Sequence, residues 1–402
     1  MKKSETENKT AILEHIYNAT RVKERSVDIS GPVTEALIRA YGQEGSYEKA
    51  KLVFDSIEGP TDGSCLRAVL FACAKAEPSS RWEEAISILH SSDITAGAIG
   101  PGGMEQGALS SAIIACAKAD RWEESWNLLQ IYGVPARKGM ASSLSVVAFN
   151  ALVAACGRKG RPDVAVHILN TMETQYGVIP DERSYRNAVI ACNQAEHERR
   201  RHLTLASRYG EKENRKKSEP STLQWWECSL ALLRRMQEAD LKPDIQTFSS
   251  CISACEAAGQ WQRALGVLQT MINDESSEGT EETVLNLFCF NAAISACEKG
   301  GAWVEALEIY ERMISYGGLL TPNFVTLSAL VLALINASQK ELAQSKFEEG
   351  LKMKIINPWK YTKDANGNRV RAMVGKYLSA VWYIDSSWYS NLSLYRSLDS
   401  ST

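Results

Sequence analysis

Six cysteines recur at one place in a repeated pattern, and they are the first candidates for chemistry. They are Cys73, Cys116, Cys156, Cys192, Cys255 and Cys297. Packed helices lie about 8 to 10 Å apart, whereas a disulfide requires Cα atoms within about 7 Å. Cys251 shares a helix face with Cys255, yet no histidine or CxxC partner lies near them in the sequence, so zinc is not expected. We therefore predict that these thiols are small buried hydrophobes.

Other catalytic and cofactor signals are weak. The five histidines form neither an H-E-x-x-H nor an H-x-E arrangement, and no P-loop or dinucleotide fingerprint is present. The segment 359–402 contributes only Asp364, Asp385 and Asp399, too few carboxylates to build a nuclease site. We predict a protein that is not an enzyme and that has no cofactor, no metal and no small-molecule substrate.

Charge and hydropathy limit the possible partners. The net charge of -3 and the pI near 6.1 give no global attraction for polyanions, so any nucleic-acid binding must depend on a local arrangement. No run of eighteen apolar residues offers a membrane span. The first ten residues are mixed in charge and contain no arginine, unlike an organelle presequence. We expect either a cytosolic protein or a recorded start that omits a targeting segment.

The elements that must position any site are pairs of short amphipathic helices, seen most clearly from Phe290 to Met313. Phe290, Ile294 and Cys297 line one helical face, and Gly300-Gly301 predicts the turn. After the turn a second apolar stripe starts at Trp303 and includes Ala306, Leu307, Tyr310 and Met313. Pro322 closes the unit. Such a hairpin needs neighbours of its own kind to bury both stripes.

The hairpin repeats along the chain. The phrase A-C-A-K-A occurs at 72–76 and again at 115–119, and each copy precedes an R-W-E-E phrase. We predict an all-α solenoid of about eight helix-turn-helix repeats over residues 31–358, interrupted by a basic insertion at about 196–221 and an acidic one at about 274–282. Residues 1–30 are predicted to be an N-terminal cap, with a helix over 11–22, or a disordered tail. Residues 359–402 are predicted to be a tail of low order, with one capping helix around Val370 to Trp382.

The pattern resembles the pentatricopeptide repeat family. An aromatic-Asn pair heads the first helix, glycine makes the turn, E-A-L-x-[IL] lies in the second helix, and Pro-Asp or Pro-Asn closes the unit, most clearly over residues 146–323. The A-C-E-K-G phrases look like those of algal members and of the repeat region of protein-only RNase P, without a nuclease domain. Tetratricopeptide repeats have a similar period of 34, but there tryptophan lies in the first helix. Here Trp82, Trp122, Trp261 and Trp303 open the second helix.

The resemblance implies a right-handed solenoid that binds single-stranded RNA at about one base per repeat. The residue after the helix aromatic and the last residue of the repeat face the base, because amides, hydroxyls and carboxylates can bond in its plane. Carried over, the base-facing pairs are Asn150 with Asp181, Ser249 with Asn286, and Asn291 with Asn323, which look like uracil-, adenine- and cytosine-leaning pairs. The base-stacking residues are Val147, Gln246, Phe288 and Val325.

Several units depart from this pattern. Glu35 with Asp62 would place two carboxylates at a base, Arg67 and Arg186 match no ordinary pair, and Ser110 with Ser145 is ambiguous. The N-terminal repeats are therefore candidates for binding other proteins. Asn150 and Asn291 could also simply cap or start their helices, although Ser110, Ser249 and Ser328 keep the same position polar.

The basic insertion is a candidate for binding phosphates. This segment contains eight lysines and arginines but only five glutamates. The phosphate-contacting candidates are Arg199, Arg200, Arg201, Arg215, Lys216 and Lys217. The alternative is a solvated, disordered loop.

The resulting hypothesis for the whole chain is a non-catalytic RNA-binding adaptor in RNA processing, stability or translation, and the alternative is a protein-interaction scaffold. The family resemblance implies a mitochondrion or chloroplast, with the cytoplasm as the alternative.

Overall fold

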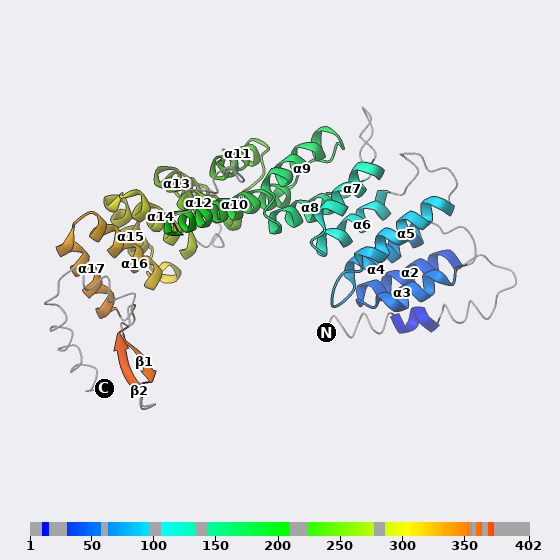
Figure 1. The fold of residues 1–402 in the computed structure, drawn as a ribbon, viewed down its shortest axis with the longest axis horizontal. Coiled ribbons are helices and arrows are strands. Elements are labelled where there is room, and N and C mark those ends of the chain that lie inside the picture. The colour runs from blue at the N-terminus through cyan, green and yellow to red at the C-terminus, as the bar shows by residue number, and fades with distance from the viewer. Residues whose placement is uncertain are drawn as a thin grey trace. The chain divides into compact units, whose positions relative to one another are not determined.

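The structure is a computed structural model, and it describes residues 10–15, 30–57, 63–95, 106–133, 144–209, 224–276, 286–353, 355, 359–363 and 369–373. Within these residues the chain forms sixteen labelled helices and one pair of strands. The helices follow one another as eight hairpins, which confirms the predicted all-α repeat array (Figure 1). None of the described helices is both long and apolar enough to cross a membrane.

The chain divides into two compact units. The first comprises residues 1–195 and 234–242, and the second comprises 196–233 and 243–402. In the first unit the leading helices of successive hairpins pack against one another, and each second helix packs on its own partner. These helices are α2 (Ser30–Gln43), α3 (Tyr47–Asp55), α4 (Gly63–Lys75), α5 (Trp82–Thr95), α6 (Gln106–Lys118), α7 (Trp122–Tyr132), α8 (Val146–Arg158) and α9 (Pro162–Thr174).

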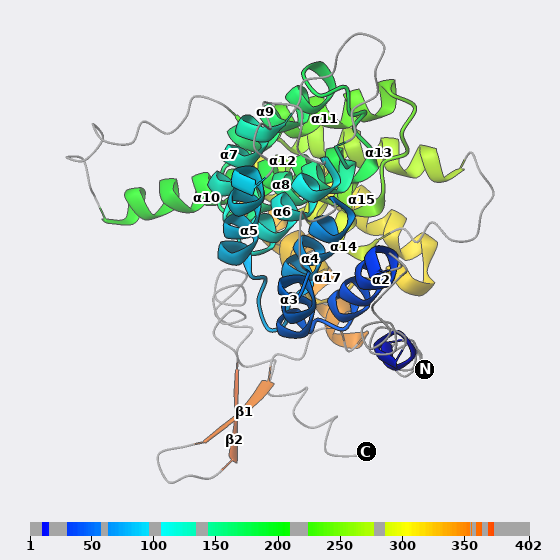
Figure 2. The ribbon, with the colours of Figure 1, turned by 90° about the vertical axis from the view of Figure 1, so that its right-hand side faces the viewer.

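The second unit has the same two-layer arrangement. Its leading helices α12 (Ile245–Ala258), α14 (Leu287–Gly300) and α16 (Phe324–Asn336) lie side by side (Figure 1), and α12 and α14 can be followed again in Figure 2. Helices α13 (Trp261–Ser276), α15 (Trp303–Tyr316) and α17 (Lys340–Lys352) each pack on the preceding leading helix, and a short 3₁₀ helix (Gly318–Leu320) precedes α16. The fifth hairpin, α10 (Glu182–Tyr209) and α11 (Trp225–Glu238), contributes residues to both units.

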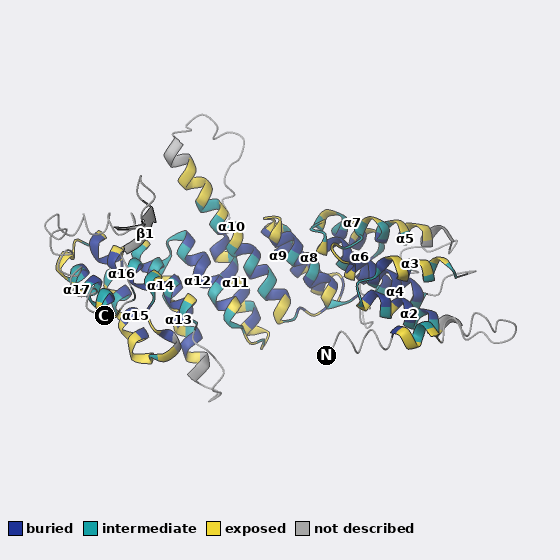
Figure 3. Cartoon of the chain, turned by 90° about the horizontal axis from the view of Figure 1, so that it is seen from below, coloured by how far each residue is buried: buried dark blue, intermediate teal, exposed yellow. Residues whose placement is uncertain are grey.

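Small side chains allow the leading helices to pack closely. The six repeated cysteines and the alanines around them are fully or almost fully buried, and all ten cysteines have free thiols. Burial raises the pKa of Cys156 and Cys297 to about 12. The prediction that these cysteines are packing residues is therefore confirmed. Figure 3 shows buried residues in dark blue along the leading helices α4, α8 and α12.

The turns within the hairpins have local causes. Gly259 and Gly301 end α12 and α14 with φ of 72°, a conformation in which a side chain is strained. The tryptophans predicted to open the second helices do so at α5, α7, α13 and α15. In the first unit the guanidinium carbon of Arg121 lies 4.5 Å from the ring centroid of Trp82, and that of Arg161 lies 5.0 Å from the centroid of Trp122. These cation–π contacts link successive second helices.

Two segments differ from the sequence prediction. Helix α10 continues through the first half of the predicted basic insertion to Tyr209, where a loop was expected from Glu196. Its sequence from 182 to 209 contains no glycine or proline, and ion pairs such as Arg201 with Glu198, three residues apart, support the helix.

At the C-terminus, β1 (Trp359–Lys363) and β2 (Arg369–Met373) form an antiparallel pair, with Trp359 opposite Met373. The helix expected from Val370 is therefore wrong for residues 370–373. Asn366-Gly367 between the strands is a hairpin-turn sequence. The rest of the expected helix lies outside the described residues, as do most of residues 1–30 and the acidic insertion beyond Ser276. Residues 10–15, which overlap the start of the helix expected over 11–22, are helical.

Candidate nucleic-acid interface

Asn150 and Asp181 are in direct contact. Asn150 is in the first turns of α8, and its Nδ2 donates to Asp181 Oδ1 at 2.9 Å. The backbone N–H of Ser184 also donates to Asp181 Oδ1, at 2.8 Å, so this carboxylate caps the first turn of α10. Burial raises the pKa of Asp181, but the hydrogen bonds from Asn150 and Ser184 outweigh burial, and the net pKa is lowered. Asp181 therefore stays ionised at neutral pH.

The amide oxygen of Asn150 is held by a second group. The hydroxyl of Ser184 donates to Asn150 Oδ1 at 2.6 Å, and its oxygen accepts from the backbone N–H of Asp181 at 3.1 Å. Asn150 is only 8% exposed and Ser184 is fully buried. One N–H of the Asn150 amide is left over after these bonds, and it is the group that could meet a ligand.

Asn291 and Asn323 make the same arrangement in the second unit. Asn291 Nδ2 donates to Asn323 Oδ1 at 3.4 Å, and Thr326 Oγ1 donates to Asn291 Oδ1 at 2.6 Å. Asn323 and Thr326 form a capping box at the start of α16. The two sites thus share three parts: an asparagine near the start of one repeat, a capping Asp or Asn at the end of the same repeat, and a hydroxyl three residues later, in the next repeat.

The hydroxyls of Ser184 and Thr326 were not among the residues predicted from the sequence. The available signal was the capping-box spacing, because Asp181 and Ser184, like Asn323 and Thr326, are three residues apart. The pattern predicts a helix start, but it does not indicate that the hydroxyl reaches back to the preceding repeat.

The third predicted pair is not joined in this way. Ser249 Oγ donates to the carbonyl of Gln246 in its own helix at 3.0 Å. Asn286 Oδ1 accepts from the backbone N–H of Phe288 at 2.9 Å and so caps α14. The residue three positions after Asn286 is Cys289, a weaker hydrogen-bond donor than a hydroxyl.

The four predicted base-stacking residues lie in the first turn of their helices and face solvent. Val147 is 58% exposed, Phe288 is 54% and Val325 is 52%, and Gln246 is also exposed. Val147 precedes Asn150 by three residues, as Phe288 precedes Asn291, so each pair shares one helix face. An exposed apolar side chain therefore stands beside each of the two asparagine sites.

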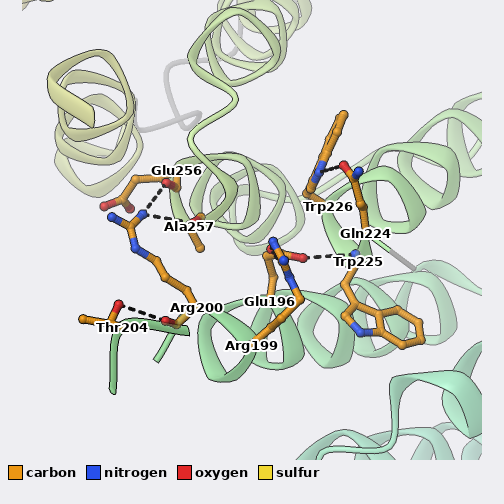
Figure 4. A network of polar contacts seen from close by, with 9 residues as sticks. All are labelled: Glu196, Arg199, Arg200, Thr204, Gln224, Trp225, Trp226, Glu256 and Ala257. Carbon is orange, nitrogen blue, oxygen red and sulfur yellow. Dashed lines mark hydrogen bonds and ion pairs between the residues drawn. The ribbon is translucent and has the colours of Figure 1, made fainter. Parts of the chain in front are cut away.

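The arginines of α10 mostly bind the protein itself. Arg199 pairs with the buried Glu196, and Arg200 Nη1 donates to the carbonyls of Glu256 and Ala257, at 3.1 and 2.9 Å (Figure 4). Arg201 is exposed and lies 2.9 Å from Glu198. Arg215, Lys216 and Lys217 lie outside the described residues.

Glu196 anchors the start of α11. Its Oε2 accepts the backbone N–H of Trp225 at 3.1 Å, while Oε1 accepts from Arg199 (Figure 4). The carboxylate thus supplies an N-terminal cap across the long connection between α10 and α11. The neighbouring His197 bonds Ser253 at 2.8 Å, and burial lowers its pKa.

In the N-terminal repeats, the residues at the predicted base-facing positions have other partners. Glu35 pairs with Arg39 and lies 3.7 Å from Arg67, so two of the positions that would face a base neutralise each other. Ser110 accepts a hydrogen bond from the backbone N–H of Ser145 at 3.1 Å, which brings that predicted pair together.

Among the residues that the structure describes, no group of three or more His, Cys, Asp and Glu side chains is placed to hold a metal ion.

Family models match four segments of the chain. The PPR repeat model matches residues 36–59, 147–175 and 288–318, and the pentatricopeptide repeat domain model matches residues 231–275. Each of these segments is therefore similar to a pentatricopeptide repeat. Two of the four include an asparagine site described above, at Asn150 and at Asn291.

The individual proteins that resemble this chain share only a small part of its sequence. A chloroplastic pentatricopeptide repeat-containing protein of Arabidopsis thaliana is 26% identical over 115 residues, which are 29% of this chain and 10% of that protein. The crystal structure of PPR10 from maize has 14% identity and a TM-score of 0.31, covering 87% of this chain and 56% of that one. PPR10 in complex with an 18-nucleotide psaJ RNA element has 15% identity and a TM-score of 0.29, covering 82% and 56%. This chain therefore spans about half of PPR10 and a tenth of the Arabidopsis protein.

Proposed function

We propose that this chain binds single-stranded RNA along its pentatricopeptide repeats, without catalysis of its own. The observation that carries the proposal is the repeated site at Asn150 with Asp181 and at Asn291 with Asn323. In both, a fixed amide keeps one N–H for a ligand, and an exposed apolar side chain lies three residues earlier on the same helix. A base offers an acceptor at its edge and an apolar face for stacking, and both features match this site.

The base preferences follow from the family resemblance. Asn150 with Asp181 is proposed to favour uracil and Asn291 with Asn323 to favour cytosine. Ser249 with Asn286 is proposed to favour adenine, although in the structure each of these side chains bonds its own helix. Val147, Gln246, Phe288 and Val325 are proposed to stack against the bases.

Phosphate attraction must come from local charge, because the whole chain has a net charge of -3. Arg201, Arg215, Lys216 and Lys217 are the proposed contacts. Arg199 and Arg200 are weaker candidates, because they already bond Glu196 and the carbonyls that end α12. If the other four contribute, the logarithm of the binding constant falls linearly with the logarithm of the salt concentration, and replacing Arg215, Lys216 and Lys217 by glutamine makes that slope less steep by about 2.

The N-terminal repeats are proposed to bind protein rather than RNA. The pairing of Glu35 with Arg39 and Arg67 favours this division, because a base there would have to compete with an ion pair. A scaffold that binds protein along its whole length is the competing function. Three further points stay predictions: a role in RNA processing, stability or translation, a location in a mitochondrion or chloroplast, and the likeness to protein-only RNase P. The similar Arabidopsis protein is described as chloroplastic.

The test is direct binding. The purified full chain is titrated with short single-stranded RNAs over a series of salt concentrations, beside duplexes of the same sequence. The proposal expects salt-sensitive binding that is weaker for the duplex. Binding to neither, or equal binding to both, would leave the scaffold as the better account.

A further inference from the structure

We propose that the hydroxyls of Ser184 and Thr326 orient the amides of Asn150 and Asn291 and thereby help to determine which base each repeat prefers. This inference rests on the proposed RNA binding and assigns a positioning role to two residues that would not themselves touch a base. Each hydroxyl belongs to the repeat after the asparagine, so each site is completed only by its neighbour.

The orientation of Asn291 can be traced to a helix start. The backbone N–H of Thr326 donates to Asn323 Oδ1 at 3.1 Å, which fixes the oxygen of that amide. This oxygen faces Asn291 Nδ2 at 3.4 Å, and the Thr326 hydroxyl donates to Asn291 Oδ1 at 2.6 Å. The two ends of an amide have nearly the same shape, so only such partners decide which end lies where.

The fixed orientation has a consequence for recognition. With its oxygen bound to a hydroxyl and one N–H bound to the capping residue, the Asn291 amide keeps a second N–H that neither partner accepts. A half-turn of the amide would place its oxygen against Asn323 Oδ1, and two acceptors repel. The site therefore presents a donor and selects for a base with an acceptor at that place.

The hydroxyl matters more for Asn291 than for Asn150. Asp181 is ionised and accepts from Asn150 at 2.9 Å, so this charge-assisted bond holds the amide even without help. Asn323 is neutral and its bond to Asn291 is longer, at 3.4 Å. Loss of the hydroxyl should therefore relax base preference more at Asn291.

The Ser249 repeat provides a contrast within the same chain. Cys289 occupies the position of Ser184 and Thr326, and Asn286 caps its helix through the N–H of Phe288 instead. Ser249 bonds back to Gln246. Where the hydroxyl is replaced by a thiol, the two halves of the predicted pair each bond their own helix.

The experiment compares base preference in the full chain with Thr326→Val, Thr326→Ser and Ser184→Ala. Binding is measured with four RNAs that differ only at the nucleotide where Asn291→Ala abolishes base preference. Thr326→Val keeps the size of the side chain and the backbone N–H that donates to the capping Asn323. We expect it to reduce discrimination at that nucleotide about three- to tenfold, the worth of one hydrogen bond. Thr326→Ser should restore it, and Ser184→Ala should have a smaller effect at the nucleotide read by Asn150.

A purely structural role would give a different pattern. Thr270→Val, in the second helix of another hairpin, is the matched control and should leave base preference unchanged. If the wild-type chain discriminates bases through Asn291 and folded Thr326→Val discriminates equally well, the positioning role is wrong while RNA binding stands. If the wild-type chain binds no RNA, or Asn291→Ala changes no preference, the proposed function itself fails.

Discussion

The indole of Trp261 occupies the space that a side chain at Gly300 would need. A Cβ at Gly300 would lie 2.1 Å from Trp261 Cδ1 and 2.8 Å from Cγ. Gly300 is thus required for packing, whereas the adjacent Gly301 has φ of 72° and nothing within 4 Å of its missing Cβ. The two adjacent glycines therefore have different roles. Gly300 leaves room for Trp261 of the preceding hairpin, and Gly301 adopts the positive φ of the turn.

Gly300→Ala is therefore expected to destabilise the second unit by about 1–3 kcal/mol, because the tryptophan must move. Alanine is otherwise the better helix former by about 0.5–1 kcal/mol. Gly266→Ala is the matched control, since this glycine is exposed within α13 and nothing lies within 4 Å of its missing Cβ. Urea unfolding should show a loss for the first and a small gain for the second. A gain for both would mean that Trp261 does not depend on Gly300.

Asp181 should make stability depend on pH in acid. Its pKa is lowered in the folded chain, so the stabilisation is complete above the unfolded pKa of about 4 and is lost as the pH falls through the folded value. Asp181→Asn retains a capping side chain, as at Asn323, but cannot titrate. The difference in free energy of unfolding between the wild type and this variant should fall between pH 5 and the acid limit of folding. Because all other carboxylates are shared, a difference that is independent of pH would contradict the assigned pKa shift.

The repeated cysteines should be slow to react in the native chain. Burial raises the pKa of Cys73, Cys116, Cys156, Cys255 and Cys297 to about 12. Cys228 is partly exposed and should be alkylated before these five. Alkylation at pH 8, followed by peptide mass spectrometry, measures each site. All ten should react in denaturant, and rapid native labelling of the five would show that the helices do not pack as described.

Much of the fold could be predicted from sequence because the signals are local and repeated. The tryptophans mark the second helices, glycine marks the turns, and the cysteines mark the packed face of the leading helices. Family positions also paired Asn150 with Asp181, and the two side chains are in contact, but that they face a base stays a prediction. The contacts of Glu196 and Arg200 could not be predicted, since their partners lie 29 and 56 residues away and no local pattern encodes such distances.

Glu196 illustrates the energetic consequence of such a distant contact. Glu196→Ala would leave the buried N–H of Trp225 and the head of Arg199 without their acceptor. We expect a loss of about 3 kcal/mol or more in the stability of the second unit. Glu198→Ala, on the exposed side of the same helix, should cost less than about 1 kcal/mol. Similar unfolding curves for the two variants would show that Glu196 does not anchor α11.

The central claim is that the asparagine sites contact RNA. Its most direct test is the affinity of the wild type, Asn150→Ala and Asn291→Ala for a bound single-stranded RNA over a salt series, with Asn170→Ala as the control. Asn170 lies on the exposed side of a second helix, where its amide accepts from Arg235 at 2.7 Å. We predict salt-sensitive binding that each site variant weakens about three- to tenfold and the control leaves unchanged. Binding that is absent, or that is indifferent to both Asn150→Ala and Asn291→Ala, would contradict the account.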